Sequence, residues 1–163
     1  MNMSWSKYHR AFGVYGIYVE EGELLVINKN GGPYMNRFDL PGGSLKEGET
    51  LSEAMKREYL EETGLEIEIQ ESIGVIDFKL PWLWKEFTDV HHIAVYYSVR
   101  NIGGKIQTPE QFEGQDSLGA VWVSEKDVSL DNASPLVLKA FEWLRTKDLG
   151  IDAEIYQDWK VLK

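Results

Sequence analysis

The sequence predicts an α/β (α+β) domain, in which helices pack in layers against a β-sheet. Two observations support this fold class. Segments with the apolar or alternating pattern of strands occur along the chain together with two helical segments. The length of 163 residues, with 43% hydrophobic residues, is typical of a globular domain with a sizeable core. Because the sequence contains no repeat, low-complexity tract or linker, we expect one domain over residues 1–163.

The sequence predicts six strands and two helices, with the first helix between the third and fourth strands and the second helix after the sixth strand. Strands are expected at residues 11–20, 23–29, 38–40, 66–78, 91–100 and 120–124, and helices at residues 51–63 and 135–147. A Gly-rich loop precedes the third strand, and a Trp-rich turn is expected after residue 78. The apolar run Ala11–Val19 resembles a short signal peptide, but no small-residue cleavage site follows it. A β-hairpin around the sequence Glu-Glu-Gly-Glu is therefore favoured for residues 11–29.

The composition excludes several classes of function. The chain has 17 basic and 27 acidic residues, so its formal net charge is −10. Such a chain is a poor candidate for binding nucleic acid or an anionic membrane through a basic surface. An anionic substrate would need a local reversal of charge, which a divalent cation can supply. The absence of cysteine excludes disulfides and a catalytic thiol, and it fits a reducing compartment, so we expect a cytoplasmic protein with no membrane span.

Both ends of the first helix carry clear signals. Thr50 and Glu53 form the T-x-x-E pattern of a capping box. Gly64 can adopt the left-handed conformation that ends a helix, and Leu65 follows as the hydrophobic contact. The acidic residues of this segment therefore belong to the last two helical turns.

Three glutamates of this helix are expected on the same side as its apolar residues when each residue advances by about 100°. The glutamates are Glu58, Glu61 and Glu62, and the apolar residues are Leu51, Ala54 and Met55. A solvated face would instead place the acids opposite the apolar residues. Clustered carboxylate oxygens are the ligands that hard divalent cations require. Metal binding is thus favoured over a solvated face, and both interpretations remain open at this point.

The longer segment GSLKEGETLSEAMKREYLEETGL, residues 43–65, resembles the signature of the Nudix hydrolases. The matching residues are Gly43, Glu49, Arg57, Glu58, Glu61, Glu62, Gly64 and Leu65. One position departs from the pattern, because Tyr59 stands where the family usually has an aliphatic residue. The resemblance implies a Nudix-like α/β/α sandwich around a mixed β-sheet, and MutT-like members are the nearest comparison.

The resemblance also implies an activity and a cofactor. The family hydrolyses a phosphoanhydride bond in nucleoside diphosphate derivatives, which include nucleoside triphosphates, oxidised nucleotides, nucleotide sugars and ADP-ribose. It uses Mg²⁺ or Mn²⁺. The implied metal ligands are Glu58, Glu61, Glu62 and the carbonyl group of Gly42. A salt bridge between Arg57 and Glu49 is implied to hold the preceding loop to the helix.

The identity of the general base is left open. The sequence FEGQDS, residues 112–117, resembles a functional loop of MutT-type members and points to Glu113. Acids are also common in polar loops, and in other members the base lies on the helix. Glu113 and a helix acid therefore both remain candidates.

Other residues carry weaker signals. Trp82, Trp84 and Phe87 can stack on a base or can simply pack in the fold. Lys29 and Arg37 flank the Gly-rich loop, where they could contact phosphates or be ordinary surface residues. His91 and His92 begin an alternating strand, so their side chains are expected on opposite faces.

The sequence thus predicts an enzyme whose partner is a small phosphate-containing substrate, most simply a nucleotide. We expect no nucleic acid or membrane partner, and a homodimer is left open. The alternative is a non-catalytic nucleotide-sensing or regulatory protein on the same fold. Such proteins usually have an eroded motif and an added DNA-binding domain, whereas the motif here is intact.

Overall fold

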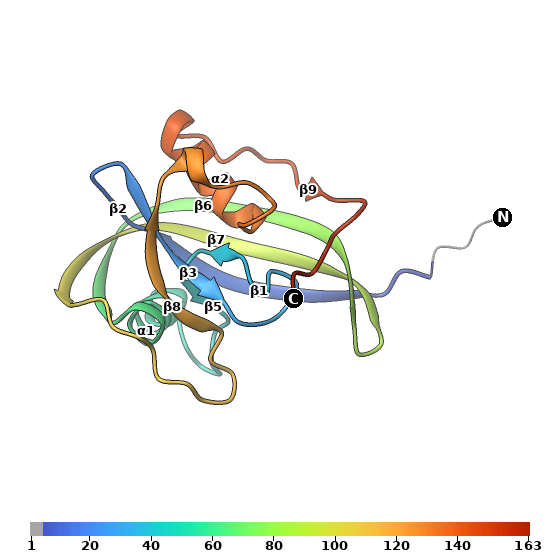
Figure 1. The fold of residues 1–163 in the computed structure, drawn as a ribbon, viewed down its shortest axis with the longest axis horizontal. Helices are drawn as coiled ribbons and strands as arrows, with labels where there is room; N and C mark the ends of the chain where they lie inside the picture. Colours follow the sequence, from blue (N-terminus) through green and yellow to red (C-terminus); the bar gives the residue numbers. More distant parts are fainter. Residues whose placement is uncertain (1–4) are drawn as a thin grey trace.

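The computed structural model describes residues 5–163 and contains two β-sheets and two α-helices (Figure 1). The strands are β1 (Tyr8–Ile17), β2 (Val19–Glu20), β3 (Glu23–Lys29), β4 (Phe38–Asp39), β5 (Gly42–Gly43), β6 (Leu65–Trp84), β7 (Phe87–Gly104), β8 (Ser117–Val123) and β9 (Glu154–Ile155). The helices are α1 (Leu51–Thr63), α2 (Pro135–Thr146) and the short 3-10 helix η1 (Glu125–Asp127).

The larger sheet has the strand order β5-β1-β7-β6-β9 and is mixed. Strand β1 runs parallel to β7 over its whole length, and β9 runs parallel to β6. The pairs β6–β7 and β1–β5 are antiparallel. In the smaller sheet β3 pairs antiparallel with β2, β4 and β8. The mixed sheet predicted from the sequence is therefore confirmed.

The long hairpin β6–β7 differs from the prediction of a Trp-rich turn after residue 78. Strand β6 continues through Trp84, and β7 begins at Phe87, so the turn is confined to the two residues between them. The rings of Trp82 and Trp84 stack with their centroids 5.3 Å apart, and Trp84 stacks on Phe87 at 6.0 Å. Trp84 and Phe87 are opposite each other in the hairpin, and such cross-strand aromatic pairs stabilise paired strands, which favours extension of the hairpin through the Trp-rich segment.

The segment predicted as one strand over residues 11–20 is divided between the two sheets. Only Val19 and Glu20 pair with β3, so the predicted hairpin is confirmed for β2 and β3 alone. The preceding residues form β1, which enters the larger sheet beside β7. Residues 13–17 of β1 are buried on both faces. A strand buried on both faces suits the interior of a layered sheet and not one arm of an exposed hairpin.

The helices cover opposite faces of the sheets (Figure 1), as the predicted α/β/α sandwich requires. Helix α2 places Leu136 and Phe141 in a core cluster with Tyr96 of β7. Helix α1 places Met55 and Tyr59 in a second cluster against the other side of the sheet. Within residues 5–163, neither helix has the length and apolar content needed to cross a membrane.

Both predicted ends of α1 are confirmed. The Thr50 hydroxyl oxygen accepts a hydrogen bond of 3.2 Å from the Glu53 backbone N–H. At the other end Gly64 has φ = 88° and donates its N–H to the Leu60 carbonyl oxygen. A Cβ atom at Gly64 would collide with the carbonyl oxygen of Lys105. Gly64 is therefore required both by the left-handed conformation and by the close approach of the chain that follows β7.

Replacing Gly64 by alanine tests this double requirement. Gly48 is a matched control, because its φ is 80° and a Cβ atom there would have no neighbour within 4 Å. We expect Gly48→Ala to lower the free energy of unfolding by about 1–2 kcal/mol through left-handed strain alone. Gly64→Ala should lower it by roughly 2–4 kcal/mol, because the collision is added to the strain. Urea denaturation measures both changes, and equal losses in the two variants would contradict the close approach.

Candidate active site

Three of the four glutamates of α1, Glu58, Glu61 and Glu62, line one cavity of about 420 Å³. Glu62 is buried, with 2% of its surface exposed. The side chains of Glu58 and Glu61 are 16% and 32% exposed, respectively. Glu62 therefore lies on the buried side of the helix, as predicted, whereas Glu58 and Glu61 are only partly buried. Leu51 was expected on the same side but is exposed. We call this space the acid cavity.

The loop before α1 approaches the acid cavity through its backbone. The Gly42 N–H donates a 2.6 Å hydrogen bond to Glu62 Oε1. Gly42 has φ = 148°, and a Cβ atom there would collide with the carbonyl oxygen of Val14. Only glycine can bring the backbone this close, so Gly42 contributes to the site by its lack of a side chain.

Two carboxyl groups of the acid cavity, those of Glu62 and Glu58, are costly to ionise without a cation. Burial raises the pKa of Glu62 well above its usual range, an effect that the charge of Lys29 partly offsets, and burial also raises the pKa of Glu58. Within residues 5–163, no three acidic or histidine side chains are placed to hold one metal ion. Glu58 and Glu61 accept hydrogen bonds from Arg57 instead. The oxygen donors therefore suit a divalent cation chemically, but the carboxylates would have to turn toward it.

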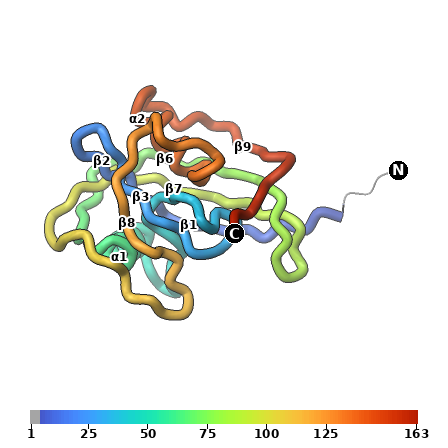
Figure 2. The backbone as a smooth tube through the Cα atoms, viewed as in Figure 1, coloured from blue at the N-terminus to red at the C-terminus, as the bar shows by residue number. Residues whose placement is uncertain are grey.

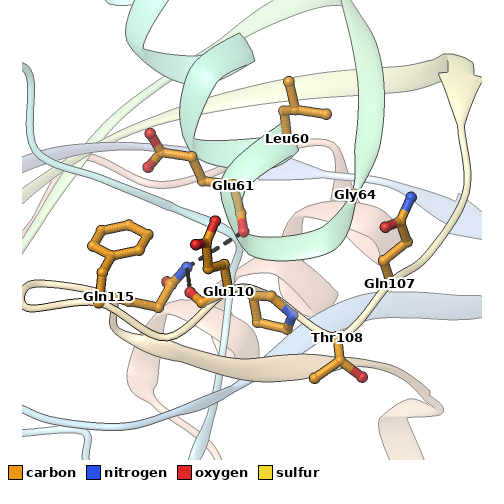
Figure 3. Close-up of a pocket in the computed structure, with 9 residues that line it drawn as sticks. Leu60, Glu61, Gly64, Gln107, Thr108, Glu110 and Gln115 are labelled. Carbon is orange, nitrogen blue, oxygen red and sulfur yellow. Dashed lines mark hydrogen bonds between the residues drawn. The ribbon is translucent and has the colours of Figure 1, made fainter.

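The loop between β7 and β8 forms the facing wall of the acid cavity. Gln115 Nε2 donates hydrogen bonds to the carbonyl oxygens of Glu61, at 3.4 Å, and Glu110, at 3.2 Å (Figure 3). The Ser117 hydroxyl group donates to the carbonyl oxygen of Glu62 at 3.2 Å. The bonds to Glu61 and Glu62 satisfy carbonyl groups in the last turn of α1. They also hold the loop against α1, and Glu113 of this loop lines the acid cavity. Gln115 and Ser117 belong to the sequence FEGQDS, but nothing in that sequence predicts their hydrogen bonds to α1.

A second cavity, of about 540 Å³, adjoins the first and is lined by aromatic rings. We call it the aromatic cavity. The two cavities have Tyr15, Lys29, Ser44 and Asp116 in common. Trp82 and Trp84, whose role the sequence left open, both line the aromatic cavity, whereas Phe87 only stacks behind Trp84. A molecule with a flat organic group could therefore reach both cavities at once.

Comparison with known proteins identifies the family. The model of the NUDIX domain matches residues 7–146, which include α1 and all the residues that line the two cavities. This chain belongs to the Nudix hydrolase family.

Curated relatives carry names of two related activities. An ADP-ribose pyrophosphatase of Methanocaldococcus jannaschii is 40% identical over 99 residues, which are 61% of this chain and 56% of that protein. A putative 8-oxo-dGTP diphosphatase of Bacillus subtilis is 32% identical over 105 residues, or 64% of this chain and 60% of that protein. In both cases the chain spans less than two thirds of the relative's length.

Solved structures support the same fold. A MutT Nudix hydrolase of Burkholderia pseudomallei superimposes with a TM-score of 0.62 at 21% identity, covering 82% of this chain and 97% of that one. A Nudix hydrolase of Nitrosomonas europaea gives a TM-score of 0.61 at 18% identity, covering 92% of this chain and 82% of that one. At this identity the likeness concerns the fold alone.

In this Nudix chain, the salt bridge expected between Arg57 and Glu49 is present. Arg57 Nε and Nη2 donate to the two carboxylate oxygens of Glu49 at 2.6 and 2.9 Å. Nη2 also donates to the carbonyl oxygen of Ser44, while Nη1 donates to Glu58 and Glu61. The hydrogen bonds from Arg57 lower the pKa of Glu49 to about 2. One guanidinium group thus joins the loop to the acids of α1.

The two basic residues beside the Gly-rich loop have different surroundings. Lys29 lies between the cavities, and its ammonium group is 3.3 Å from the Asp116 carboxylate. Burial lowers its pKa, but the charges of Asp39 and Asp116 outweigh burial, so the pKa is raised and Lys29 stays protonated. The interpretation of Arg37 as an ordinary surface residue is wrong, because Arg37 is 5% exposed and donates to the carbonyl oxygens of Leu130 and Lys160. Those buried carbonyl groups would lose their partner if Arg37 turned away. Arg37 lines neither cavity, so nothing supports the phosphate contact that the sequence left open.

His92 and two tyrosines form the polar floor of the aromatic cavity. Hydrogen bonds join His92 Nε2 to the Tyr15 hydroxyl at 2.7 Å and Nδ1 to the Tyr34 hydroxyl at 2.9 Å. Burial lowers the pKa of His92 to about 3, so the ring is neutral near pH 7. One tyrosine therefore donates to the ring and the other accepts from it. His91 lies on the opposite face and bonds Asp77, as the alternation predicted.

The coupling between Arg57 and Glu49 can be measured with a double-mutant cycle. We expect Arg57→Ala and Glu49→Ala each to lower the thermal unfolding temperature. In the double variant the decrease in unfolding temperature should be smaller than the sum of the decreases in the two single variants. The cycle of Arg100→Ala and Glu68→Ala is the matched control, because that pair has a similar contact of 2.6 Å but both side chains are at least half exposed. A coupling no larger than that of the control pair would show that the salt bridge between Arg57 and Glu49 does not hold the loop to the helix.

Proposed function

We propose that this Nudix chain hydrolyses a phosphoanhydride bond in a nucleoside diphosphate derivative. One observation carries the proposal: the acid cavity, which suits metal and phosphates, shares four lining residues with an aromatic cavity that suits an organic group. The intact set of acids favours an enzyme over the nucleotide-sensing alternative. The names of the relatives, an ADP-ribose pyrophosphatase and a putative 8-oxo-dGTP diphosphatase, describe substrates of this class.

In this proposal Mg²⁺ or Mn²⁺ is held by the acid cavity. The donors are the carboxylates of Glu58, Glu61 and Glu62 and the carbonyl oxygen of Gly42. A bound divalent cation would neutralise phosphate charge and lower the pKa of bound water. The raised pKa values of Glu58 and Glu62 support this assignment, since a cation removes the cost of ionising buried carboxyl groups.

The residues around the metal position have separate tasks in the proposal. Arg57 and Glu49 keep the loop against α1, so that the carboxylates stay on one side of the cavity. Lys29, which remains protonated at the junction of the cavities, is placed to contact a phosphate. Within residues 5–163, Glu113 is the one glutamate of the cavity for which no hydrogen bond or ion pair is recorded. Its carboxylate is therefore free to accept a proton from the attacking water.

The aromatic cavity would hold the group attached to the diphosphate. Trp82 and Trp84 are stacked with an interplanar angle of 6°, and such flat surfaces stack on nucleobases. The His92 floor below them is neutral and offers both donors and acceptors. A small nucleotide satisfies these features, whereas the net charge of −10 opposes long RNA or DNA.

Metal dependence is the first test. Hydrolysis should stop in chelator and return with Mg²⁺ or Mn²⁺. We expect Glu61→Gln and Glu62→Gln each to lower kcat by at least about a hundredfold, the scale of losing a principal electrostatic contributor. Both variants should remain folded, because they relieve repulsion between like charges. Glu53→Gln, an exposed acid on the same helix, is the control and should leave kcat unchanged. Unaltered rates in both cavity variants would remove the metal assignment.

The substrate class is the second test. A panel of ADP-ribose, 8-oxo-dGTP, 8-oxo-dGDP and a nucleotide sugar should be assayed with Mg²⁺, with a simple phosphate monoester as the control. We expect turnover of at least one panel member, because both cavities can then be filled, and no turnover of the monoester. Hydrolysis in heavy-oxygen water should place the label on a phosphate product, which shows attack at phosphorus. Turnover of the monoester alone would refute the proposed reaction.

A further inference from the structure

Residues 147–163 follow the part of the chain that matches the NUDIX domain, which ends at residue 146. We call this segment the strap. Its strand β9 pairs in parallel with β6 at Phe78 and Lys79. Beyond β9 the strap turns back toward the loop between β3 and β4, residues 30–37 (Figure 2). We call that loop the cavity loop, because its residues 31–34 line the aromatic cavity.

Three side-chain hydrogen bonds join the strap to the cavity loop. Trp159 Nε1 donates to the carbonyl oxygen of Pro33 at 2.7 Å. Arg37 Nη1 donates to the carbonyl oxygen of Lys160 at 2.8 Å, and Asn36 Nδ2 donates to that of Leu162 at 3.3 Å. The cavity loop contains no helix or strand between residues 30 and 37. Backbone hydrogen bonds close the loop between Lys29 and Arg37 and join Asn30 to Asp116. The bonds to the strap add a second set of contacts that hold the loop in place.

Arg37 adds a stacking contact to these bonds. Its guanidinium carbon lies 4.3 Å from the centre of the Trp159 ring, which is cation–π geometry. Arg37 Nε also donates to the carbonyl oxygen of Leu130, so the guanidinium group joins the cavity loop, the strap and the turn before α2. Since Arg37 is almost fully buried, these contacts are shielded from water and stronger than surface contacts.

Tyr34 connects the strap to the aromatic cavity. Its ring meets that of Trp159 edge-on, with centroids 5.9 Å apart, on the side of the strap. Its hydroxyl group bonds His92 Nδ1 at the floor of the aromatic cavity. A displacement of Trp159 would thus move Tyr34 and the polar floor together.

We propose that the strap is a positioning element that sets the shape of the aromatic cavity and thereby the affinity for the group attached to the diphosphate. Trp159 and Arg37 act as positioning residues, since neither lines the acid cavity. The inference rests on the proposed function for the identity of that group. It predicts an effect on binding of the organic group, with metal binding and the chemical step left unchanged.

The test compares three variants of the full chain. Trp159→Ala removes the hydrogen bond and the ring, and Trp159→Phe keeps a ring without the N–H group. Ile151→Ala is the matched control, because Ile151 belongs to the strap but is 94% exposed. Calorimetry with AMP in chelator measures binding to the aromatic cavity without the metal. Steady-state kinetics with ADP-ribose and 8-oxo-dGTP, together with Mn²⁺ titration, separates KM, kcat and metal affinity.

We expect Trp159→Ala to raise the Kd for AMP and the KM about tenfold, the scale of losing a buried hydrogen bond together with a ring contact. The kcat and the Mn²⁺ affinity should stay within about twofold, since the acid cavity is untouched. Trp159→Phe should lie between Trp159→Ala and the original chain, and Ile151→Ala should match the original chain. Hydrogen exchange should quicken at residues 30–37 in Trp159→Ala, because the cavity loop loses its support.

Unchanged Kd and KM in Trp159→Ala would overturn the inference, as would an equal loss of kcat and Mn²⁺ affinity, which marks a general structural defect. Absence of AMP binding to the original chain would also overturn it. If the original chain binds AMP but hydrolyses no diphosphate-linked substrate, the proposed function fails, while the AMP and hydrogen-exchange results still decide the role of the strap.

Discussion

Arg57 places one positive charge among three carboxylates that belong to two different elements. It binds both oxygens of Glu49 in the loop and, through Nη1, Glu58 and Glu61 on α1. Without this charge the acids of α1 would repel one another at the end of a helix whose dipole already disfavours anions. The loop, the helix and the acid cavity therefore depend on a single guanidinium group, which holds the carboxylates near one another while leaving their oxygens at the cavity.

The electrostatics of the site differ from those of the whole chain. The net charge is −10, yet the junction of the two cavities contains Lys29, which remains protonated although it is buried. The charges of Asp39 and Asp116 raise the pKa of Lys29 and so keep it protonated, and a neutral His92 also lines the aromatic cavity. Lys29 would give an anionic substrate one positive charge, but the surrounding acids outnumber it. The remaining reversal of charge would have to come from a bound divalent cation.

Much of the fold and the acid cavity could be predicted from the sequence, because the signals are local. The capping residues of α1 and the spacing of Glu58, Glu61 and Glu62 act within a few helical turns. The division of residues 11–20 between two sheets could not be predicted, since it depends on which strand lies beside β1. The buried position of Arg37 could not be predicted for a similar reason: its partners, the carbonyl groups of Leu130 and Lys160, are 93 and 123 residues away.

The sequence by itself determined the helix, its two ends, the set of acids and, through their spacing, the resemblance to the Nudix family. Periodicity and capping are short-range interactions, so they can be read without knowing the fold. Only the tertiary structure decided that the acid cavity adjoins an aromatic one, that His92 lies between Tyr15 and Tyr34, and that Trp159 supports the cavity loop. These contacts join segments 58 to 126 residues apart, and packing of the complete sheets is what brings such distant segments together.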